Sequence, residues 1–414
     1  MNRKHIYIAI ISAFICCTVI VLFVIKSMQN NHGSGKEIYN YDSVDSQCNY
    51  SESNVLYLDD SGILHLIDTA SGKNIIYCDK PNCTHEGFSR NNENPSCPAA
   101  FWGLNMSGAV LHNGHLYFVG NMENEDGLQT QYLYEMDSNG EKRKKVAELE
   151  DVQNVRYVLY RDNYAIGAYY NSCELDEEGQ IADDNKPEAG IFVINLDNYK
   201  VHMSDKVAKE QANVTGIYYE NGVVYYSVAH FGEDVTQLML EEASENNAES
   251  FAYENMIYDL YQYNIEKQST ELLKSFDHII SFQLLENEAY YSTKDGWYVF
   301  DPDSKQSRKL GIDVYGGDIS GTFVKNEDAL YYNVLDNDGE EYIYCQMENG
   351  KCSELMRVKS EDSFIVENIC GNSVYIDYTN NNGEFCLGVV NLDDYNNGKF
   401  EPRELRALNE DEEE

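Results

Sequence analysis

Short runs in which apolar and polar residues alternate recur along most of the chain, and many of its 34 tyrosines lie in them. Clear examples run from Gly114 to Val119, from Gly222 to Ser227 and from Ala329 to Asn333. Alternation with a period of two, rich in aromatic and β-branched residues, predicts half-buried β-strands. The segment from Thr236 to Met256 is rich in Glu and Ala and predicts a helical insertion. The body is therefore expected to be all-β.

The strand-like runs follow one repeated order. A strand and a short turn precede a tyrosine-rich strand, and a variable loop then leads to two further strands joined by a turn. The clearest copy runs from Ile279 to Leu310. Its tyrosine-rich strand aligns with segments that begin at Glu52, His112, Arg161, Glu220, Asn326 and Cys370. Seven such units predict a β-propeller with seven four-stranded blades. Six or eight blades, or two β-sandwiches, are the alternatives.

A continuous apolar run precedes this pattern. The twenty positions from Ile6 to Ile25 carry no charge, and a helix of about 20 residues crosses the hydrocarbon core of a bilayer. Arg3 and Lys4 come before the run, which favours a cytoplasmic N-terminus and an extracytoplasmic body. A cleaved signal peptide and lipid attachment at Cys16 or Cys17 are alternatives. However, the run exceeds the length of most signal peptides, and no small residue precedes either cysteine.

These features divide the chain into five parts. The polar segment from Ser27 to Lys36 contains Gly and Ser, as flexible linkers do. The run from Glu410 to Glu414 is typical of a solvated acidic tail. We expect a cytoplasmic N-terminus at residues 1–5, a transmembrane helix at 6–25, a linker at 26–36, a propeller at 37–407 and a tail at 408–414.

The charge of the chain limits its partners. Acidic residues number 71 and basic residues 30, so the formal net charge is −41. Such a surface repels phosphate backbones, and we expect no nucleic-acid partner. The hydrophobic content of 43% is nevertheless enough for a sizeable core, so the charge does not indicate a disordered chain.

Nine cysteines lie beyond the apolar run, where an oxidising exterior favours disulfides. Cys345 and Cys352 flank a tight turn, and a hairpin there could bring their side chains together. Cys370 and Cys386 could bridge neighbouring strands of the last unit. Both pairs are therefore disulfide candidates.

A compact set of potential metal ligands follows the first unit. Cys78, Cys83, His85 and Cys97 lie within about twenty residues. Three thiols and one imidazole can complete a tetrahedral zinc site. The spacing differs from that of a zinc finger, because one residue separates Cys83 from His85. A disulfide that fastens the loop, from Cys83 to Cys78 or to Cys97, is slightly favoured over zinc because the exterior is oxidising, and the sequence leaves both open.

The same segment carries a resemblance to a known family. Cys78 to His85 reads CDKPNCTH, and CPA follows at Cys97. Together with the apolar run and the tyrosine-rich units, this resembles a family of uncharacterised membrane-anchored extracytoplasmic β-propellers of Gram-positive anaerobes, a domain of unknown function related to lipoprotein-receptor-type propellers. The resemblance implies the fold and the location but no activity. The chain departs from many members in lacking a lipobox.

No pattern typical of catalysis stands out. The sequence has no G-x-S-x-G elbow, no H-E-x-x-H helix, no P-loop and no dinucleotide fingerprint. We therefore expect a protein that is not an enzyme. The predicted function is a binding or scaffolding module at the cell envelope, held in the membrane by residues 6–25, with a protein, peptide or glycan as ligand. A polysaccharide-active enzyme with carboxylates at the propeller channel and a ligand-sensing ectodomain are the alternatives.

Overall fold

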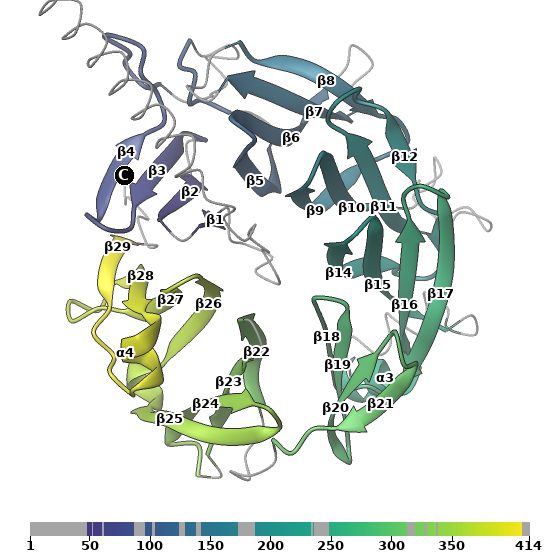
Figure 1. Cartoon of the computed structure of the whole chain (residues 1–414), viewed down its shortest axis with the longest axis vertical. Coiled ribbons are helices and arrows are strands. Elements are labelled where there is room, and N and C mark those ends of the chain that lie inside the picture. The colour runs from purple at the N-terminus through teal and green to yellow at the C-terminus, as the bar shows by residue number, and fades with distance from the viewer. Residues whose placement is uncertain are drawn as a thin grey trace, which may run out of the picture. The chain divides into compact units, whose positions relative to one another are not determined.

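Seven antiparallel sheets follow one another along the chain and stand around a ring as the blades of a β-propeller (Figure 1). The structure is a computed structural model, which describes residues 48–51, 53–59, 62–86, 96–101, 104–123, 129–137, 142–172, 187–232, 235, 248–312, 319–326, 329–336 and 338–407. Each sheet has its four strands in sequence order, and the third blade adds a short fifth strand. The prediction of an all-β propeller with seven four-stranded blades is confirmed.

Each blade is built from one contiguous stretch of chain. Blade 1 comprises β1 (Cys48–Tyr50), β2 (Asn54–Leu58), β3 (Leu64–Asp68) and β4 (Lys73–Ile76), and blade 2 comprises β5 (Leu104–His112), β6 (His115–Glu123), β7 (Gln129–Asp137) and β8 (Lys144–Leu149). Blade 3 comprises β9 (Asn154–Arg161), β10 (Tyr164–Asn171), β11 (Glu188–Asn195), β12 (Val201–Met203) and the added β13 (Val207–Ala208). Blade 4 comprises β14 (Asn213–Glu220), β15 (Val223–Phe231), β16 (Met256–Asn264) and β17 (Ser269–Asp277). Blade 5 comprises β18 (Ser281–Leu285), β19 (Glu288–Thr293), β20 (Gly296–Asp301) and β21 (Gln306–Lys309). Blade 6 comprises β22 (Ile319–Asn326), β23 (Ala329–Leu335), β24 (Glu341–Glu348) and β25 (Lys351–Lys359). Blade 7 comprises β26 (Phe364–Cys370), β27 (Ser373–Thr379), β28 (Phe385–Asn391) and β29 (Arg403–Ala407).

In the part of the chain that the structure describes, two short α-helices interrupt the strands. Helix α3 (Ala248–Asn255) occupies the end of the predicted insertion between β15 and β16, whereas residues 236–247 lie outside the described part. Helix α4 (Leu392–Asn396) joins β28 to β29. Among the described residues, no helix combines the length and the apolar character needed to cross a bilayer. The predicted membrane helix at residues 6–25 lies outside them.

The hydrophobic core lies between the blades. Seven clusters of buried side chains each join two neighbouring blades, so that every interface around the ring has its own apolar contact. Tyrosines are prominent among the largest fully buried side chains, and they include Tyr50, Tyr169, Tyr226, Tyr344 and Tyr375. A broad ring that also carries a hydroxyl can fill a wide gap between sheets. This packing explains why tyrosine dominates the alternating runs.

Buried hydrogen bonds also connect neighbouring blades. The side-chain amide of Asn49 in β1 donates to the backbone oxygen of Ala109 in β5 at 2.9 Å. Gln283 in β18 both donates to the oxygen of Phe323 and accepts from its N–H, each at 2.9 Å. Both amides lie in the first strand of a blade, which is the strand closest to the centre of the ring (Figure 1). They therefore fix the spacing of adjacent blades at the centre.

The ring closes where blade 7 meets blade 1, and the described strands of the two blades form separate sheets. The Tyr375 hydroxyl donates to the backbone oxygen of Ser51 at 2.5 Å, and the Arg406 guanidinium lies 4.1 Å from the centre of the Tyr57 ring. The apolar part of the interface consists of Cys48, Tyr50, Val55, Tyr57 and Ile67 from blade 1 and Cys370, Tyr375, Leu387, Val389 and Leu405 from blade 7. Closure therefore rests on side-chain packing and a few hydrogen bonds.

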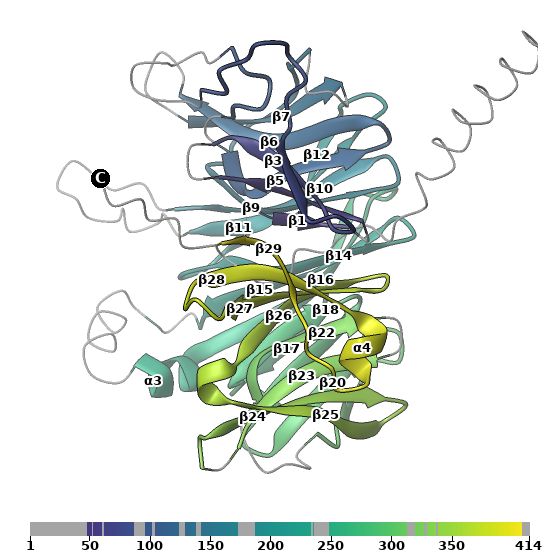
Figure 2. The ribbon, with the colours of Figure 1, turned by 90° about the vertical axis from the view of Figure 1, so that its left-hand side faces the viewer.

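The two faces of the ring differ in their connections. Because strands alternate in direction, the connections from second to third strand and from one blade to the next emerge on one face, which we call the loop face. This face carries the long connections that follow Ile76, Asn171 and Phe231. The opposite face carries mostly tight turns, with α4 as its largest element. Helices α3 and α4 accordingly lie on opposite faces (Figure 2).

Two carboxylates lie at the closing interface. Glu367 occupies a bulge in β26, where the register with β27 shifts between Val366 and Asn368. Burial raises the pKa of Glu367. Burial, and then the Glu367 charge, raise the pKa of Asp377 to about 7, although Arg406 opposes this effect. The ring thus closes beside two carboxyl groups whose pKa values are raised because burial disfavours the charged form.

The pH dependence of stability tests this arrangement. The folded state holds the Asp377 proton more tightly than the unfolded chain, whose Asp pKa is about 3.9. The stability contributed by this group is therefore fully present below about pH 4 and is lost as the pH rises through its folded pKa of about 7. We expect Asp377→Asn to raise the melting temperature relative to the wild type more at pH 8 than at pH 4.

The matched control for this measurement is Asp338→Asn in an exposed turn. Its difference from the wild type should be the same at both pH values. An Asp377→Asn difference that also stays constant between pH 4 and pH 8 would contradict the assignment.

Candidate functional site

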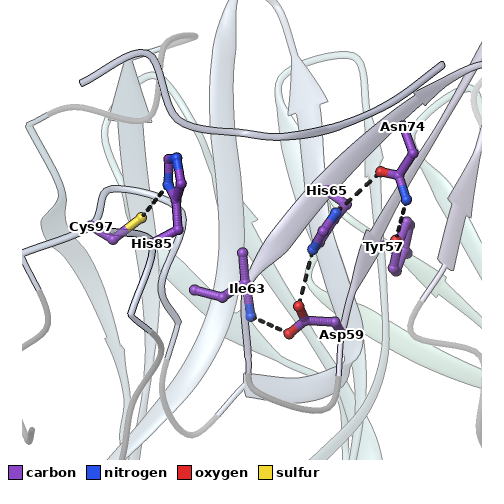
Figure 3. A network of polar contacts seen from close by, with 7 residues as sticks. All are labelled: Tyr57, Asp59, Ile63, His65, Asn74, His85 and Cys97. Atoms are coloured by element: carbon purple, nitrogen blue, oxygen red, sulfur yellow. Dashed lines mark hydrogen bonds and ion pairs between the residues drawn. The ribbon is translucent and has the colours of Figure 1, made fainter. Parts of the chain in front are cut away.

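The structure brings Cys78, Cys83, His85 and Cys97 together. One ligand atom from each, three sulfurs and one ring nitrogen, lie within 4.8 Å of one another. The distance from Cys97 Sγ to His85 Nδ1 is 3.6 Å (Figure 3). The four residues predicted from the sequence therefore form one cluster, which we call the Cys/His cluster.

The local backbone explains how Cys83 and His85 reach the same point. Tyr77 is still bonded to β3 through its N–H and the Leu64 oxygen at 2.8 Å, and the chain then turns. Asn82 and His85 adopt left-handed conformations with φ of 56° and 54°. Such a conformation is uncommon for residues other than glycine and is favoured only in tight turns. The turn at His85 removes the difficulty that the one-residue spacing raised in the sequence.

The second half of the loop is fixed to the edge of blade 1. Leu64 N–H donates to the Ala99 oxygen at 2.8 Å, and Phe101 N–H donates to the Gly62 oxygen at 2.8 Å. Gly62 has φ of 73°, and a Cβ there would lie 2.6 Å from the Phe101 oxygen. Only glycine fits this contact without displacement. Cys97 is thus held by the backbone that follows it.

Blade 2 clamps the same loop from the other side. Arg143 donates to the oxygens of Pro98 and Ala100 at 3.0 and 2.7 Å. Its guanidinium also lies 4.6 Å from the centre of the Phe101 ring. The apolar cluster between blades 1 and 2 includes Cys97 and also contacts Cys78 and Cys83. The Cys/His cluster therefore belongs to the interface between the first two blades.

The thiols differ in their electrostatic surroundings. Burial raises the pKa of Cys97 to about 12. The pKa of Cys83 is lowered, chiefly by a hydrogen bond from the backbone N–H of His85 and further by the Cys97 and Cys78 side chains and the Lys80 charge. Backbone N–H groups aimed at sulfur stabilise a thiolate. These surroundings therefore favour the thiolate form at Cys83 and oppose it at Cys97.

The predicted disulfide between Cys345 and Cys352 is absent. In the β24–β25 hairpin, Cys345 lies opposite Glu354 and Cys352 lies opposite Met347, so the cysteines are diagonal rather than facing. Diagonal positions are about 7–8 Å apart, beyond the usual reach of a disulfide. Both remain thiols, and each donates to a backbone oxygen, that of Ile343 or Gly311.

The predicted bridge between Cys370 and Cys386 is also wrong. Cys370 lies in β26 and Cys386 in β28, with β27 between them. Cys370 pairs with Ser373 at one end of β27, whereas Cys386 pairs with Tyr378 near the other end. Two strand spacings already exceed the span of a disulfide. The two residues belong to different interfaces of blade 7.

A second polar network in blade 1 was missed in the sequence. His65 Nε2 lies 3.0 Å from Asp59 Oδ2, and His65 Nδ1 lies 3.1 Å from Asn74 Oδ1 (Figure 3). Asn74 also donates to the Tyr57 hydroxyl at 2.7 Å. Asp59 accepts from the Ile63 N–H at 2.8 Å and so shapes the turn to which the end of the loop with the Cys/His cluster is bonded. Only the strand register, which pairs Tyr57 with His65, would have indicated it.

The loop face carries exposed apolar side chains. Tyr170 lies next to the last residue of β10, Ile280 precedes β18, and Ile365 is the second residue of β26, all at strand ends on this face. Ile280 and Ile365 are 60% and 53% exposed, the two highest values among the exposed large hydrophobic residues of the described part. Exposed apolar groups near long loops are typical of a binding surface.

Comparisons with known proteins identify the fold. No protein-family model and no curated protein matches the sequence. A puromycin-hydrolysing peptidase of Mycobacterium tuberculosis is similar in structure, with a TM-score of 0.55, 10% identity and coverage of 90% of this chain and 56% of that chain. An acylaminoacyl peptidase of Pyrococcus horikoshii has a TM-score of 0.50 and 11% identity, with coverage of 90% of this chain and 53% of that chain. The propeller domain of the Trilobed protease of Pyrococcus furiosus has a TM-score of 0.48 and 10% identity, with coverage of 90% of this chain and 98% of that chain.

These likenesses correct one expectation. The prediction that the chain is not an enzyme is wrong as a conclusion from this architecture, because the similar solved structures include peptidases. The chain spans little more than half the length of the first two, 53% and 56%. At 10–11% identity, the similarity shows the fold and transfers no activity.

Gly62→Ala tests the backbone contact that positions the end of the loop with the Cys/His cluster. The matched control is Gly350→Ala, because Gly350 has φ of 72° but nothing within 4 Å of an added Cβ. Both variants force alanine into a left-handed conformation, which costs about 1–2 kcal/mol. Only Gly62→Ala also collides with the Phe101 oxygen. We expect its free energy of unfolding to fall by at least about 1 kcal/mol more than that of the control, measured by urea denaturation. Equal losses would show that the loop does not depend on this contact.

Proposed function

We propose that this chain is a membrane-anchored, extracytoplasmic binding or scaffolding module of the cell envelope, which binds its partner on the loop face. The single observation that carries the proposal is the concentration of the long connections and of Tyr170, Ile280 and Ile365 on one face of the ring. A fixed scaffold that presents variable loops is a common arrangement for recognition.

The chemistry of the surface favours a peptide that carries basic and apolar side chains. The net charge of −41 attracts cations and repels anionic ligands. Exposed Ile280 and Ile365 offer apolar contact beside that charge. Two similar solved structures are peptidases by description, which makes peptides the first ligand class to test. A glycan would need more polar and aromatic contacts than these residues supply.

The location and the family remain part of the proposal. The uncharged run at residues 6–25, preceded by Arg3 and Lys4, supports a membrane anchor with the N-terminus in the cytoplasm. The segment from Cys78 to Cys97 supports membership of the extracytoplasmic propeller family that it resembles. Protease protection in intact cells tests the topology: a tag at the C-terminus should be digested from outside, and one at the N-terminus should not.

Binding is tested with the full chain in lipid nanodiscs and a random peptide library, followed by titration of the selected peptides. We expect the double variant Ile280→Asp, Ile365→Asp to bind at least about tenfold more weakly, since each buried apolar side chain contributes about 1 kcal/mol or more. Leu111→Asp is the matched control, because Leu111 is also 41% exposed but lies at the end of β5 on the opposite face.

The outcomes separate the alternatives. Equal weakening by the control variant, or selection of no peptide, would contradict the peptide-binding proposal. Binding to an envelope-glycan array, with no peptide selected, would indicate that the ligand of the loop face is a glycan. Cleavage of selected peptides, followed by mass spectrometry, would show that the face acts on its ligand chemically.

A further inference from the structure

We propose that Cys78, Cys83, His85 and Cys97 bind one zinc ion and that this ion fastens blade 1 to blade 2. The proposal concerns the internal construction of the ring and does not depend on the ligand of the loop face. It starts from a complete set of four ligand atoms that lie within 4.8 Å of one another.

The distances fit a tetrahedral ion. With zinc–sulfur bonds of about 2.3 Å and zinc–nitrogen bonds of about 2.0–2.1 Å, neighbouring ligand atoms in a tetrahedron are separated by roughly 3.5–3.8 Å. The distance of 3.6 Å from Cys97 Sγ to His85 Nδ1 falls within this range. A small contraction of the other separations, all at most 4.8 Å, would complete the site. The ring nitrogen that faces the sulfur is Nδ1, which identifies the coordinating atom of His85.

A disulfide accounts for the cluster less well. A bond between any two of the sulfurs would be about 2.05 Å long and would leave the third thiol and His85 without a function. Cys78, Cys83 and Cys97 are all thiols in the structure. The left-handed turn at His85, with φ of 54°, brings the imidazole to the sulfurs. A disulfide would need no such turn, whereas a metal requires it because the imidazole is the fourth ligand.

The ligand types select the metal. Three thiolates and one imidazole are soft or intermediate donors, which favour zinc over calcium or magnesium because the latter prefer oxygen. The set is already four-coordinate, so it leaves no position for water or substrate and is typical of a structural site. Hydrogen bonds from the backbone N–H groups of His85 and Ala99 to the sulfurs of Cys83 and Cys97 add the outer support that such ligands usually have.

The position of the cluster gives the ion its role. Cys97 is 3% exposed and packs in the apolar cluster that also contains Leu116 and Phe118 of blade 2. Arg143 of blade 2 holds the backbone oxygens of Pro98 and Ala100. An ion that gathers Cys78, Cys83 and Cys97 therefore fixes the surface against which blade 2 packs. Without it, the loop between the two blades would lose its internal constraint.

The first test measures metal content and thiol protection in the full chain, purified in detergent without added reductant or chelator. Elemental analysis should give about one zinc per chain, and replacement by Co²⁺ should give the visible absorption of a tetrahedral thiolate site. Iodoacetamide should label Cys78, Cys83 and Cys97 after a zinc chelator alone is added, but not before. Labelling that requires a reductant and is insensitive to the chelator would overturn the proposal in favour of a disulfide. Labelling without either would overturn it in favour of free thiols.

Variants connect the ion to the blade interface. Cys83→Ala should lose the zinc, whereas His85→Cys should keep it, because a fourth thiolate can replace the imidazole. Cys352→Ser is the matched control, since Cys352 is a half-buried thiol in blade 6. Chelation should lower the melting temperature of the wild type and of Cys352→Ser by several degrees and leave Cys83→Ala unchanged. Should Cys83→Ala fail to fold, the metal content of His85→Cys and the wild type decides the question. Full zinc content in Cys83→Ala, or none in the wild type, would contradict the site.

Discussion

Contact between the last blade and the first is the constraint on which the ring depends. A propeller must close, and within the described residues blades 1 and 7 each consist of strands from their own stretch of chain. The apolar cluster of ten side chains, the Tyr375–Ser51 hydrogen bond and the stacking of Arg406 on Tyr57 perform this task. These side chains must fit closely, because no backbone ladder spans the gap. The tyrosine hydroxyl supplies the directional contact that an apolar interface lacks.

Two half-buried carboxyl groups make that interface sensitive to pH. Asp377 and Glu367 lie among the closing contacts, and burial raises the pKa of both. A negative charge there is opposed by desolvation and only partly compensated by Arg406. The closing contact therefore depends on protonation as well as on shape. Two other interfaces use neutral amides for inner contacts: Asn49 between blades 1 and 2, and Gln283 between blades 5 and 6.

Much of the fold could be predicted because each blade follows a local pattern. The copy from Ile279 to Leu310 corresponds to β18–β21, and the seven aligned tyrosine-rich segments correspond to the second strand of each blade. The members of the Cys/His cluster were also predicted, since they are close in sequence. The disulfide candidates failed because pairing depends on register and strand order. Cys352 lies opposite Met347, two residues beyond Cys345, and one intervening strand separates Cys370 from Cys386. The turn at His85 could not be predicted, since residues other than glycine are uncommon at positive φ and no sequence pattern marks this position.

The two faces of the ring have separate tasks. Tight turns on one face allow the strands to reverse with little exposed backbone, and the other face accepts long insertions without disturbing the sheets. The Cys/His cluster lies in one of these long connections, and the end of that connection is hydrogen-bonded to the start of β3. If the proposed zinc ion is bound there, this connection stabilises the ring, whereas the other long connections remain available for binding.

The contiguous origin of each blade also determines the order in which the protein can assemble. A blade whose four strands are consecutive can pair them as soon as it leaves a ribosome or a translocon, long before the chain is complete. Blade 1 is the exception in one respect, because the hydroxyl that covers its outer flank belongs to Tyr375, 324 residues after Ser51. During synthesis this flank stays exposed while six more blades are added. A connection that secures blade 1 to blade 2 early would protect the nascent chain during that interval.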